Sequence, residues 1–376
     1  MSRFDVVGEE AVAAGRATDA YFERTVEALA AADRDPRVVA EVTADQFPTG
    51  EYDLLAGVQD AARLLDGLAV DADALPEGTL FDGGPVLTIE GPYRAFARYE
   101  TALLGFLSHA TGMATAALGA RRAAPDSTVL SFGTRHVHPA LAAVVERSAL
   151  LAGLDGFSNV AAGEVLGREA GGTMPHALVL CFGRGNQEAA WRAFDRAVAE
   201  DVPRVALCDT FDDEVAESLR AADLGFDSVR LDTTASRRGD FGHILREVRW
   251  WLDSEGHEDV GMFVSGGLDS ERIRALRDVA DGFGVGGHVS NADPVDFSLD
   301  IVEVDGDPIA KRGKLPGRKQ VYRADGAHEV ALDGAGEGEP LLEPLVRDGE
   351  VVREFDLDDA AERAAADARA VLGPPE

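Results

Sequence analysis

Short apolar runs alternate with amphipathic stretches through the middle of the chain. Each run ends in a polar or glycine-rich turn, and a stretch with apolar positions at helical spacing follows it. The successive pairs are STVLSF and PALAAVVERSALL, RVALCDTF and DEVAESLRAAD, SVRLDT and the stretch around HILREVRWWL, and VGMFVSGG and DSERIRALRDVA, after which comes GFGVGG. Strands that alternate with helices at this interval indicate a parallel sheet. Residues 112–305 give enough length for an α/β barrel.

The sequence on either side of this region has different patterns. Residues 8–32 have apolar positions at helical spacing, and residues 80–117 begin as an extended piece and continue as an apolar helix that would connect two domains. After Asp300 the alternation is typical of antiparallel strands, and an Ala-rich acidic helix closes the chain. A length of 376 residues exceeds the roughly 100 to 200 residues of a typical domain, which predicts two domains.

The charge is strongly acidic, with 68 Asp and Glu against 36 Lys and Arg and a formal net charge of -32. Excess acid repels phosphate backbones and anionic lipids, so we expect no nucleic-acid or membrane role. Arginine supplies nearly all the positive charge. An acidic, lysine-poor surface is suited to molar salt, which screens repulsion to roughly 3 Å, so we expect a protein from an extreme halophile.

Targeting and cysteine signals are weak. The N-terminal MSRFDVVGEE has no apolar core of a signal peptide, and no run approaches the roughly 18 apolar residues that span a bilayer. We therefore expect a soluble cytoplasmic protein.

Cys181 and Cys208 both lie in apolar runs, which predicts buried thiols and neither a disulfide framework nor a cysteine metal site.

Candidate chemistry lies where strands end, because ligands of parallel α/β proteins meet the loops at the carboxyl ends of the strands. In SFGTRHVHP, Arg135 and His136 follow a strand and precede a helix, which indicates an anion site, although a solvated turn would also explain them. His176 in GGTMPH could equally be structural. Arg230 and Asp232 have strand parity, so both side chains lie on the face opposite Leu231, which in a barrel can be the mouth.

Glycine turns end two further strand-like runs about twenty residues apart. Ser265, Gly266 and Gly267 form the first turn, and Gly286 and Gly287 belong to the second. Glycine lets backbone N–H groups approach phosphate oxygens, and the last two loops of a barrel are the favoured phosphate site. Ordinary tight turns remain the alternative. No Walker loop, HExxH, GxSxG or CxxC motif occurs, which argues against P-loop, zinc-protease and serine-hydrolase chemistry.

All the lysines of the chain lie in one window, AKRGKLPGRKQ, as Lys311, Lys314 and Lys319. A lysine kept in an acidic, lysine-poor chain is more easily explained by a specific task. A compact ammonium can follow the moving oxygens of pyrophosphate, so we interpret the window as a source of cations for a phosphate site. A solvated hairpin tip is the alternative.

Several strings, taken in order, resemble the nicotinate phosphoribosyltransferase family in its archaeal branch. They are TDAYFERT, FDGGPVLTIEGPY, SFGTRHVHPA, GFSNVAAGEVLG, GGTMPHAL, LCDTFDDE, VRLDT, FVSGGLD, FGVGG and KRGKLPGRKQVYR. The resemblance implies a type II phosphoribosyltransferase: an α/β protein with an N-terminal α/β domain packed on an irregular, incomplete α/β barrel. The domains would be residues 1–111, completed by 306–376, and residues 112–305. It also implies a homodimer with shared active sites.

The resemblance further implies that nicotinate displaces pyrophosphate from 5-phosphoribosyl 1-pyrophosphate to give nicotinate mononucleotide for NAD synthesis, with Mg²⁺ and with ATP as a co-substrate that phosphorylates a histidine. In that reaction Tyr21 would stack on the pyridine ring, Arg135 and Arg230 would hold carboxylate or phosphate oxygens, Asp232 would face the ribosyl cation, and His176 would be the phosphorylated residue. The other candidates implied are His136, Arg237 and Arg238 for substrate, and Ser265, Gly266, Gly267, Gly286, Gly287, Lys311 and Lys314 for phosphate. No metal ligand is identified.

Three alternative functions fit the sequence less well. Quinolinate phosphoribosyltransferase has the same fold, but its second ring carboxylate needs an additional cation cluster. Nicotinamide carries a neutral amide in place of the carboxylate, so Arg135 would have no anion to bind. A non-catalytic sensor of pyridine nucleotides would need a partner-binding module, and the chain shows none.

Overall fold

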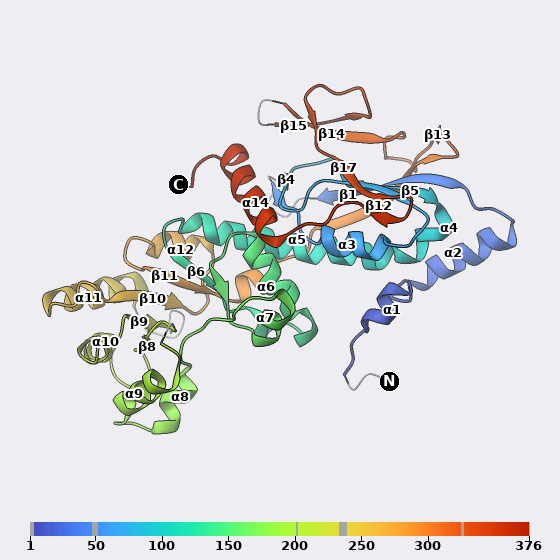
Figure 1. Ribbon diagram of the computed structural model, residues 1–376. Helices are drawn as coiled ribbons and strands as arrows, with labels where there is room; N and C mark the ends of the chain where they lie inside the picture. Colours follow the sequence, from blue (N-terminus) through green and yellow to red (C-terminus); the bar gives the residue numbers. More distant parts are fainter. Residues whose placement is uncertain (1–3, 47–51, 201, 233–238, 325–326, 376) are drawn as a thin grey trace. The chain divides into compact units, whose positions relative to one another are not determined.

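The computed structural model describes residues 4–46, 52–200, 202–232, 239–324 and 327–375. The chain divides into two compact units, and each is described by itself (Figure 1). The first unit contains Met1–Thr115, Leu151–Gly153 and Ala292–Pro374, and the second contains Ala116–Leu150, Leu154–Asn291 and Pro375–Glu376.

An antiparallel sheet of seven strands forms the centre of the first unit. In order across the sheet, the strands are β13 (Asp307–Pro308), β12 (Asp296–Val304), β1 (Arg37–Gln46), β5 (Pro85–Pro92), β3 (Asp71–Ala74), β17 (Glu343–Arg347) and β18 (Glu350–Val351). β1 pairs with β5 on one side and with β12 on the other, so segments from both ends of the chain share this sheet. Val38, Ala40 and Val42 alternate along β1 and are buried in one core, as the period of two in a strand requires.

Helices and short strands complete the first unit. Ala61, Ala62 and Leu65 of α3 (Val58–Leu65) bury one face of that helix in the same core. The helices are α1 (Glu9–Ala13), α2 (Ala20–Ala31), α3 (Val58–Leu65), α4 (Tyr93–Phe96), the first part of α5 (Glu100–Ala123) and α14 (Leu357–Val371). The short strands are β2 (Asp53–Leu54) with β4 (Leu80–Phe81), and β15 (Ala327–Leu332), β14 (Lys319–Ala324) and β16 (Glu339–Pro340).

The helical stretch Tyr93–Ala123 is long and apolar enough to cross a membrane by length and composition alone. Half of its most apolar window is buried inside the protein, and the core helix of a globular protein passes the same test. It therefore adds little support for a membrane role.

The second unit contains the parallel sheet that the alternating runs predict. Its six strands are, in order, β7 (Gly156–Phe157), β6 (Thr128–Ser131), β11 (Gly282–Val285), β10 (Gly261–Ser265), β9 (Ser228–Leu231) and β8 (Val205–Leu207), and every neighbouring pair is parallel. Among the described residues, β7 and β8 do not pair with each other, so the α/β barrel is open at this point.

Helices follow these strands, as the sequence pattern predicts. α10 (Glu214–Asp223), α11 (Phe241–Ser254) and α12 (Ser270–Leu276) each begin after an aspartate, Asp213, Asp240 or Asp269, whose side chain accepts a hydrogen bond from a backbone N–H of the first turn. α10 packs against α11 and β9. The other helices of this unit are α6 (Ala142–Leu151), α7 (Val160–Leu166), α8 (His176–Phe182), α9 (Gln187–Ala197) and α13 (Gly287–Ser290).

The prediction of two buried thiols is right for one cysteine and wrong for the other. Cys208 follows β8 and is fully buried, but Cys181 is exposed. The apolar run ALVLCF forms α8, and Val179 is the residue of this helix that is buried. A short apolar run does not by itself distinguish a buried strand from a partly exposed helix.

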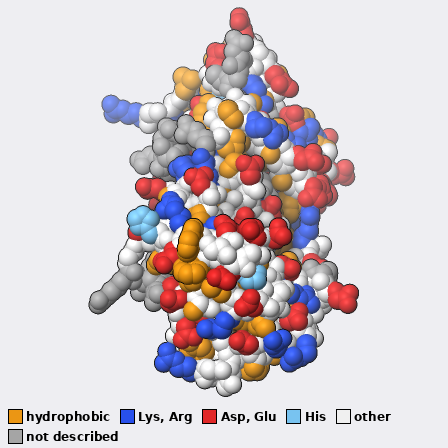
Figure 2. Space-filling view, turned by 90° about the vertical axis from the view of Figure 1, so that its left-hand side faces the viewer, with side chains coloured by type: hydrophobic (Ala, Val, Ile, Leu, Met, Phe, Trp, Pro, Cys, Tyr) orange, Lys and Arg blue, Asp and Glu red, His pale blue; other side chains and the backbone are white. Residues whose placement is uncertain are grey.

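Acidic side chains cover much of the face shown in Figure 2, with Lys and Arg scattered among them. This distribution agrees with the net charge of -32.

Candidate functional site

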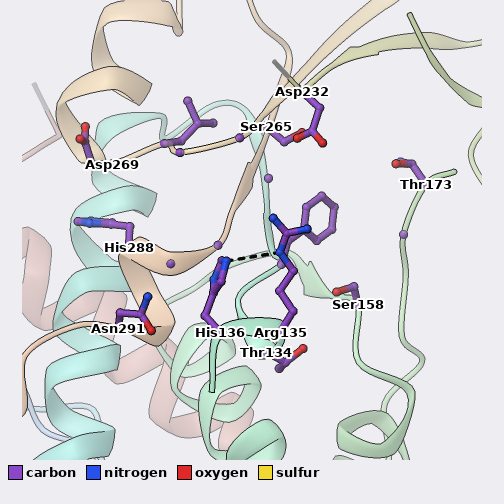
Figure 3. A pocket seen from close by; sticks show the side chains of 18 of the residues that line it. Thr134, Arg135, His136, Ser158, Thr173, Asp232, Ser265, Asp269, His288 and Asn291 are labelled. Carbon is purple, nitrogen blue, oxygen red and sulfur yellow. Dashed lines mark hydrogen bonds between the residues drawn. The ribbon is translucent and has the colours of Figure 1, made fainter. Parts of the chain in front are cut away.

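A cavity of about 670 Å³ opens in the second unit at the carboxyl ends of β6, β9, β10 and β11. Figure 3 shows the side chains gathered around it. Candidates from four separate stretches of the sequence line this one cavity: Arg135, His136, Arg230, Asp232, Ser265, Gly266, Gly267, Gly286 and Gly287.

Arg230, Asp232 and Ser265 form one hydrogen-bonded cluster in the wall of the cavity. The Ser265 hydroxyl donates to Oδ1 of Asp232 at 2.6 Å, and Nε of Arg230 donates to the Ser265 oxygen at 2.8 Å. Nη2 of Arg230 lies 3.2 Å from Oδ2 of Asp232, and its Nη1 donates to Oγ1 of Thr173 at 2.5 Å. The guanidinium also lies over the ring of Phe132 at 5.4 Å. These contacts hold the Asp232 carboxylate in one orientation.

A second acid, Asp209, lies just after β8 and supports the same strand end. Its Oδ2 accepts a hydrogen bond from the backbone N–H of Asp232 at 2.6 Å, and its side chain is 1% exposed. Nε2 of His176 lies 3.6 Å from Oδ1 of Asp209 and 3.7 Å from Oδ2 of Asp232. Nδ1 of the same ring lies 3.3 Å from the Thr210 hydroxyl. The imidazole of His176 therefore contacts two carboxylates and a hydroxyl.

The first glycine turn needs glycine for steric reasons. Gly266 has φ +93, and a Cβ there would lie 2.2 Å from the carbonyl oxygen of Asp232. Gly267 also has a positive φ, of +67. The turn after β10 therefore approaches the backbone of Asp232 more closely than any residue with a side chain would allow.

The turn after β6 faces the second glycine turn. Nε of Arg135 donates to Nε2 of His136 at 3.4 Å, which Figure 3 marks with a dashed line. The His136 ring lies against Gly286 and Gly287, where an added Cβ would approach it to 3.3 and 3.4 Å. His288 also lines the cavity, and burial lowers the pKa of its imidazole. The two glycines thus leave room for the ring of His136 beside the cavity.

Other predicted residues lie elsewhere. Tyr21 belongs to the first unit, is 57% exposed and donates to Asp19. Lys311 and Lys314 also belong to the first unit, where their ammonium groups lie 2.6 and 2.9 Å from the carboxylate of Asp300. Arg237 and Arg238 lie outside the described residues. The roles of these residues stay predictions.

The structure also places residues at the site that the strand-end reasoning did not select. Asp209 directly follows the apolar run RVALC, and the same signal marks the other strand ends. Ser158, Thr173, His288 and Asn291 line the cavity from loops and from α13, where no periodic pattern marks them.

The described residues contain no group of three or more His, Cys, Asp or Glu that could hold a metal ion. Asp232 and Asp269 bring two carboxylates to the wall of the cavity. Mg²⁺ commonly binds to one or two carboxylates together with the phosphates of a substrate. Asp232 and Asp269 could therefore hold Mg²⁺ together with a bound phosphate.

Comparisons with known proteins match nearly the whole chain. Residues 19–111 match the family model of the quinolinate phosphoribosyl transferase N-terminal domain, and residues 113–300 match that of its C-terminal domain. A nicotinate phosphoribosyltransferase of Mycobacterium tuberculosis is 32% identical over 96% of this chain and 92% of its own length. A nicotinate phosphoribosyltransferase of Bacillus subtilis is 29% identical over 66% of this chain and 54% of its own.

Solved structures show the same architecture. A Pyrococcus furiosus protein, described as nicotinate-nucleotide pyrophosphorylase, is 47% identical with a TM-score of 0.96 over 99% of each chain. Human nicotinic acid phosphoribosyltransferase has the same fold, with 21% identity and a TM-score of 0.75 over 94% of each chain. This chain therefore belongs to the nicotinate phosphoribosyltransferase family, and it is a phosphoribosyltransferase with type II architecture.

Proposed function

We propose that the protein is a nicotinate phosphoribosyltransferase. In this reaction the ring nitrogen of nicotinate forms a bond to C1 of 5-phosphoribosyl 1-pyrophosphate, the bond from C1 to the pyrophosphate oxygen breaks, and pyrophosphate leaves with that electron pair. The product is nicotinate mononucleotide, a precursor of NAD. The names of the relatives at 32% and 29% identity support this choice of substrate.

The observation that carries the proposal is that the two arginines in the cavity have different partners. Arg230 is engaged by Asp232, Ser265 and Thr173 and is 12% exposed. Arg135 contacts His136 through Nε at 3.4 Å, and its two terminal nitrogens are suited to hold one carboxylate in a fork. Among the described residues, the cavity thus offers one arginine for one ring carboxylate, which fits nicotinate better than a dicarboxylate.

The remaining groups fit the charges of the reaction. Positive charge develops on the ribose as the C1–O bond weakens, and Asp232 would stabilise it from the wall of the cavity. The glycine turns at Gly266–Gly267 and Gly286–Gly287 would present backbone N–H groups to the 5-phosphate. Mg²⁺, when bound with the donor, would offset the charge of its pyrophosphate.

ATP coupling and a homodimer belong to the same proposal. His176 contacts Asp209, Asp232 and Thr210 and is 34% exposed, so its ring is accessible to a phosphoryl donor. Transfer of the terminal phosphoryl group of ATP to a ring nitrogen would give phosphohistidine and ADP. Tyr21, Lys311 and Lys314, which belong to the first unit, would serve an active site shared between two copies of the chain.

The second candidate is quinolinate phosphoribosyltransferase. The matches to both quinolinate phosphoribosyl transferase domain models, and the 47% identity to the Pyrococcus furiosus protein described as nicotinate-nucleotide pyrophosphorylase, favour it. This activity would also release the 2-carboxylate of the substrate as CO₂.

One experiment separates these candidates. Purified protein in molar salt, with the sugar donor and Mg²⁺, is offered nicotinate, quinolinate or nicotinamide, each with and without ATP. We expect nicotinate mononucleotide and pyrophosphate from nicotinate in preference to the other two. Faster turnover of quinolinate, with release of CO₂, would establish the second candidate instead.

A further inference from the structure

A fully buried carboxylate holds the turn that follows β8. Glu217, in the first turn of α10, has no exposed surface. Its Oε1 accepts hydrogen bonds from the backbone N–H groups of Phe211 and Asp212, both at 2.7 Å. Its Oε2 accepts from the backbone N–H of Thr210 at 3.0 Å and from Nε2 of Gln187 at 2.5 Å.

Through these contacts Glu217 holds the backbone of three consecutive residues, Thr210–Asp212. Successive backbone N–H groups that converge on one anion form a nest, which compensates the loss of water around a buried carboxylate. The side chains around it extend the network, since Arg220 donates to Gln187 at 3.1 Å and to Asp212 at 2.9 Å. The backbone of the turn therefore depends on a single side chain for three of its hydrogen bonds.

The turn that Glu217 holds carries residues that contact the candidate catalytic groups. Thr210, whose N–H binds Glu217, places its hydroxyl 3.3 Å from Nδ1 of His176. Asp209 immediately precedes it and accepts from the backbone N–H of Asp232 at 2.6 Å. A shift of the turn would move both contacts together.

We propose that Glu217 is a positioning residue for the phosphoribosyl transfer: it fixes the turn Thr210–Asp212 and thereby the positions of Asp209, His176 and Asp232. This inference rests on the proposed function, because it assigns Glu217 a task in that reaction. Glu217 acts only through the turn and does not line the cavity. Displacement of reacting groups by about 1 Å can cost on the order of 100-fold in rate, so a side chain buried behind the site can limit turnover.

The test compares Glu217→Gln with Asp223→Asn. Both remove one negative charge from α10, but Asp223 lies at the end of the helix, with a side chain that is 74% exposed and paired with His257. Gln at 217 places an amide NH₂ against backbone donors, so the turn loses at least one hydrogen bond. We expect kcat to fall about 10- to 100-fold in Glu217→Gln with little change in the KM for nicotinate, and no change in Asp223→Asn.

Two further measurements separate positioning from simple loss of stability. In a double-mutant cycle, Glu217→Gln should reduce kcat much less in an Asp209→Asn background than in the wild type. Both changes weaken the same contact, which is the one between Asp209 and the backbone N–H of Asp232. Amide hydrogen exchange of residues 210–212 should be faster in Glu217→Gln and unchanged in Asp223→Asn. Wild-type kcat in a folded Glu217→Gln protein, or full additivity in the cycle, would overturn the proposal.

A milder change decides the question if Glu217→Gln does not fold. Gln187→Leu removes one of the four donors to Glu217 and keeps the charge of Glu217. It should therefore lower kcat and speed the amide exchange of residues 210–212, each to a smaller degree than Glu217→Gln. Unchanged kcat and unchanged exchange in Gln187→Leu would then overturn the proposal. If the wild type turns over no pyridine carboxylate, the proposed function fails, while the exchange data still show whether Glu217 holds the turn.

Discussion

The hydroxyl of Ser265 donates a hydrogen bond of 2.6 Å to the carboxylate of Asp232, and the two residues lie at the carboxyl ends of the neighbouring strands β10 and β9. Arg230 contacts both groups, at 2.8 Å and 3.2 Å. A carboxylate held in this way cannot rotate freely, so its charge stays directed at one place in the cavity. Preorganised charge of this kind needs no rearrangement when the transition state forms.

Asp232→Asn tests this charge directly. The amide oxygen can still accept the hydrogen bond from Ser265, but the negative charge that would face the ribosyl cation is lost. We expect turnover to fall on the order of 100-fold while the KM for nicotinate changes little. Steady-state kinetics with both substrates varied would measure this, and turnover equal to the wild type would exclude the assigned role.

His176→Ala tests ATP coupling. If the ring of His176 is phosphorylated, ATP should raise the affinity of the wild type for the sugar donor, because the added negative charge beside Asp209 and Asp232 would strengthen the binding of Mg²⁺, which would in turn hold the pyrophosphate of the donor. The variant should lose this rise and keep the basal activity measured without ATP. The donor KM with and without ATP gives the answer, and a wild type indifferent to ATP would eliminate the coupling.

Much of the second unit could be predicted because its strands are local, apolar and followed by helices. STVLSF, RVALCDTF, SVRLDT, VGMFVSGG and GFGVGG contain β6, β8, β9, β10 and β11. β7 has two residues, Gly156–Phe157, which is too short to give a periodic pattern. The rule that ligands meet strand ends selects Asp232 and Arg135, and it holds equally for Asp209, which follows β8.

The first unit was harder to predict, because its contacts join distant parts of the chain. β1 pairs with β12, and the register places Ala40 opposite Ile301, a pairing that local periodicity cannot specify. The lysine window shows the same limitation. Composition does not indicate the partners of these lysines, which are Asp300 for Lys311 and Lys314 and Glu41 for Lys319. The phosphate role of Lys311 and Lys314 stays a prediction.

Lys311→Gln tests the predicted phosphate role of the window. Lys311 is 63% exposed, and Asp300 keeps its partner Lys314 in this variant, so the fold should tolerate the change. Loss of one cation that contacts a phosphate oxygen should raise the donor KM about fivefold, the equivalent of about 1 kcal/mol. Nicotinate KM should not change. An unaltered donor KM would exclude the phosphate role of Lys311 and leave its ion pair with Asp300 as its only assigned role.

Lys319→Gln should instead destabilise the fold. Lys319 is 11% exposed and lies 2.9 Å from Oε2 of Glu41, which is 1% exposed, and its ammonium also donates to the carbonyl oxygens of Leu315 and Gly317. Removing the cation leaves a buried carboxylate without its ion-pair partner, which costs about 3 to 5 kcal/mol in the free energy of unfolding.

Denaturant unfolding in molar salt would measure that loss, with Lys311→Gln as the matched control. Because Lys311 is largely exposed, the control should lose no more than about 1 kcal/mol. Equal losses in the two variants would contradict the distinction between buried and exposed lysine pairs.

Glu146→Gln tests a pH dependence of stability that arises at a buried carboxyl group of the second unit. Glu146, on α6, is fully buried, and this burial raises the pKa of its carboxyl group to about 7 despite the Ser131 hydroxyl and the backbone N–H groups of Asn159 and Ser158, which lower it. Because the folded pKa exceeds the ordinary value of 4.5, folding takes up a proton between these two values. The stability that this group contributes is therefore fully present below pH 4.5 and is lost as the pH rises through about 7.

Gln resembles the protonated carboxyl group and does not titrate. Relative to the wild type, Glu146→Gln should therefore gain stability on the order of 3 kcal/mol between about pH 5 and pH 8. Asp53 and Glu100, with pKa values raised by burial to about 6 and about 7, titrate in the same window, but they are present in both proteins and cancel in the difference. Unfolding free energies of the two proteins across this pH range measure the effect, and parallel curves would show that Glu146 titrates normally in the folded protein.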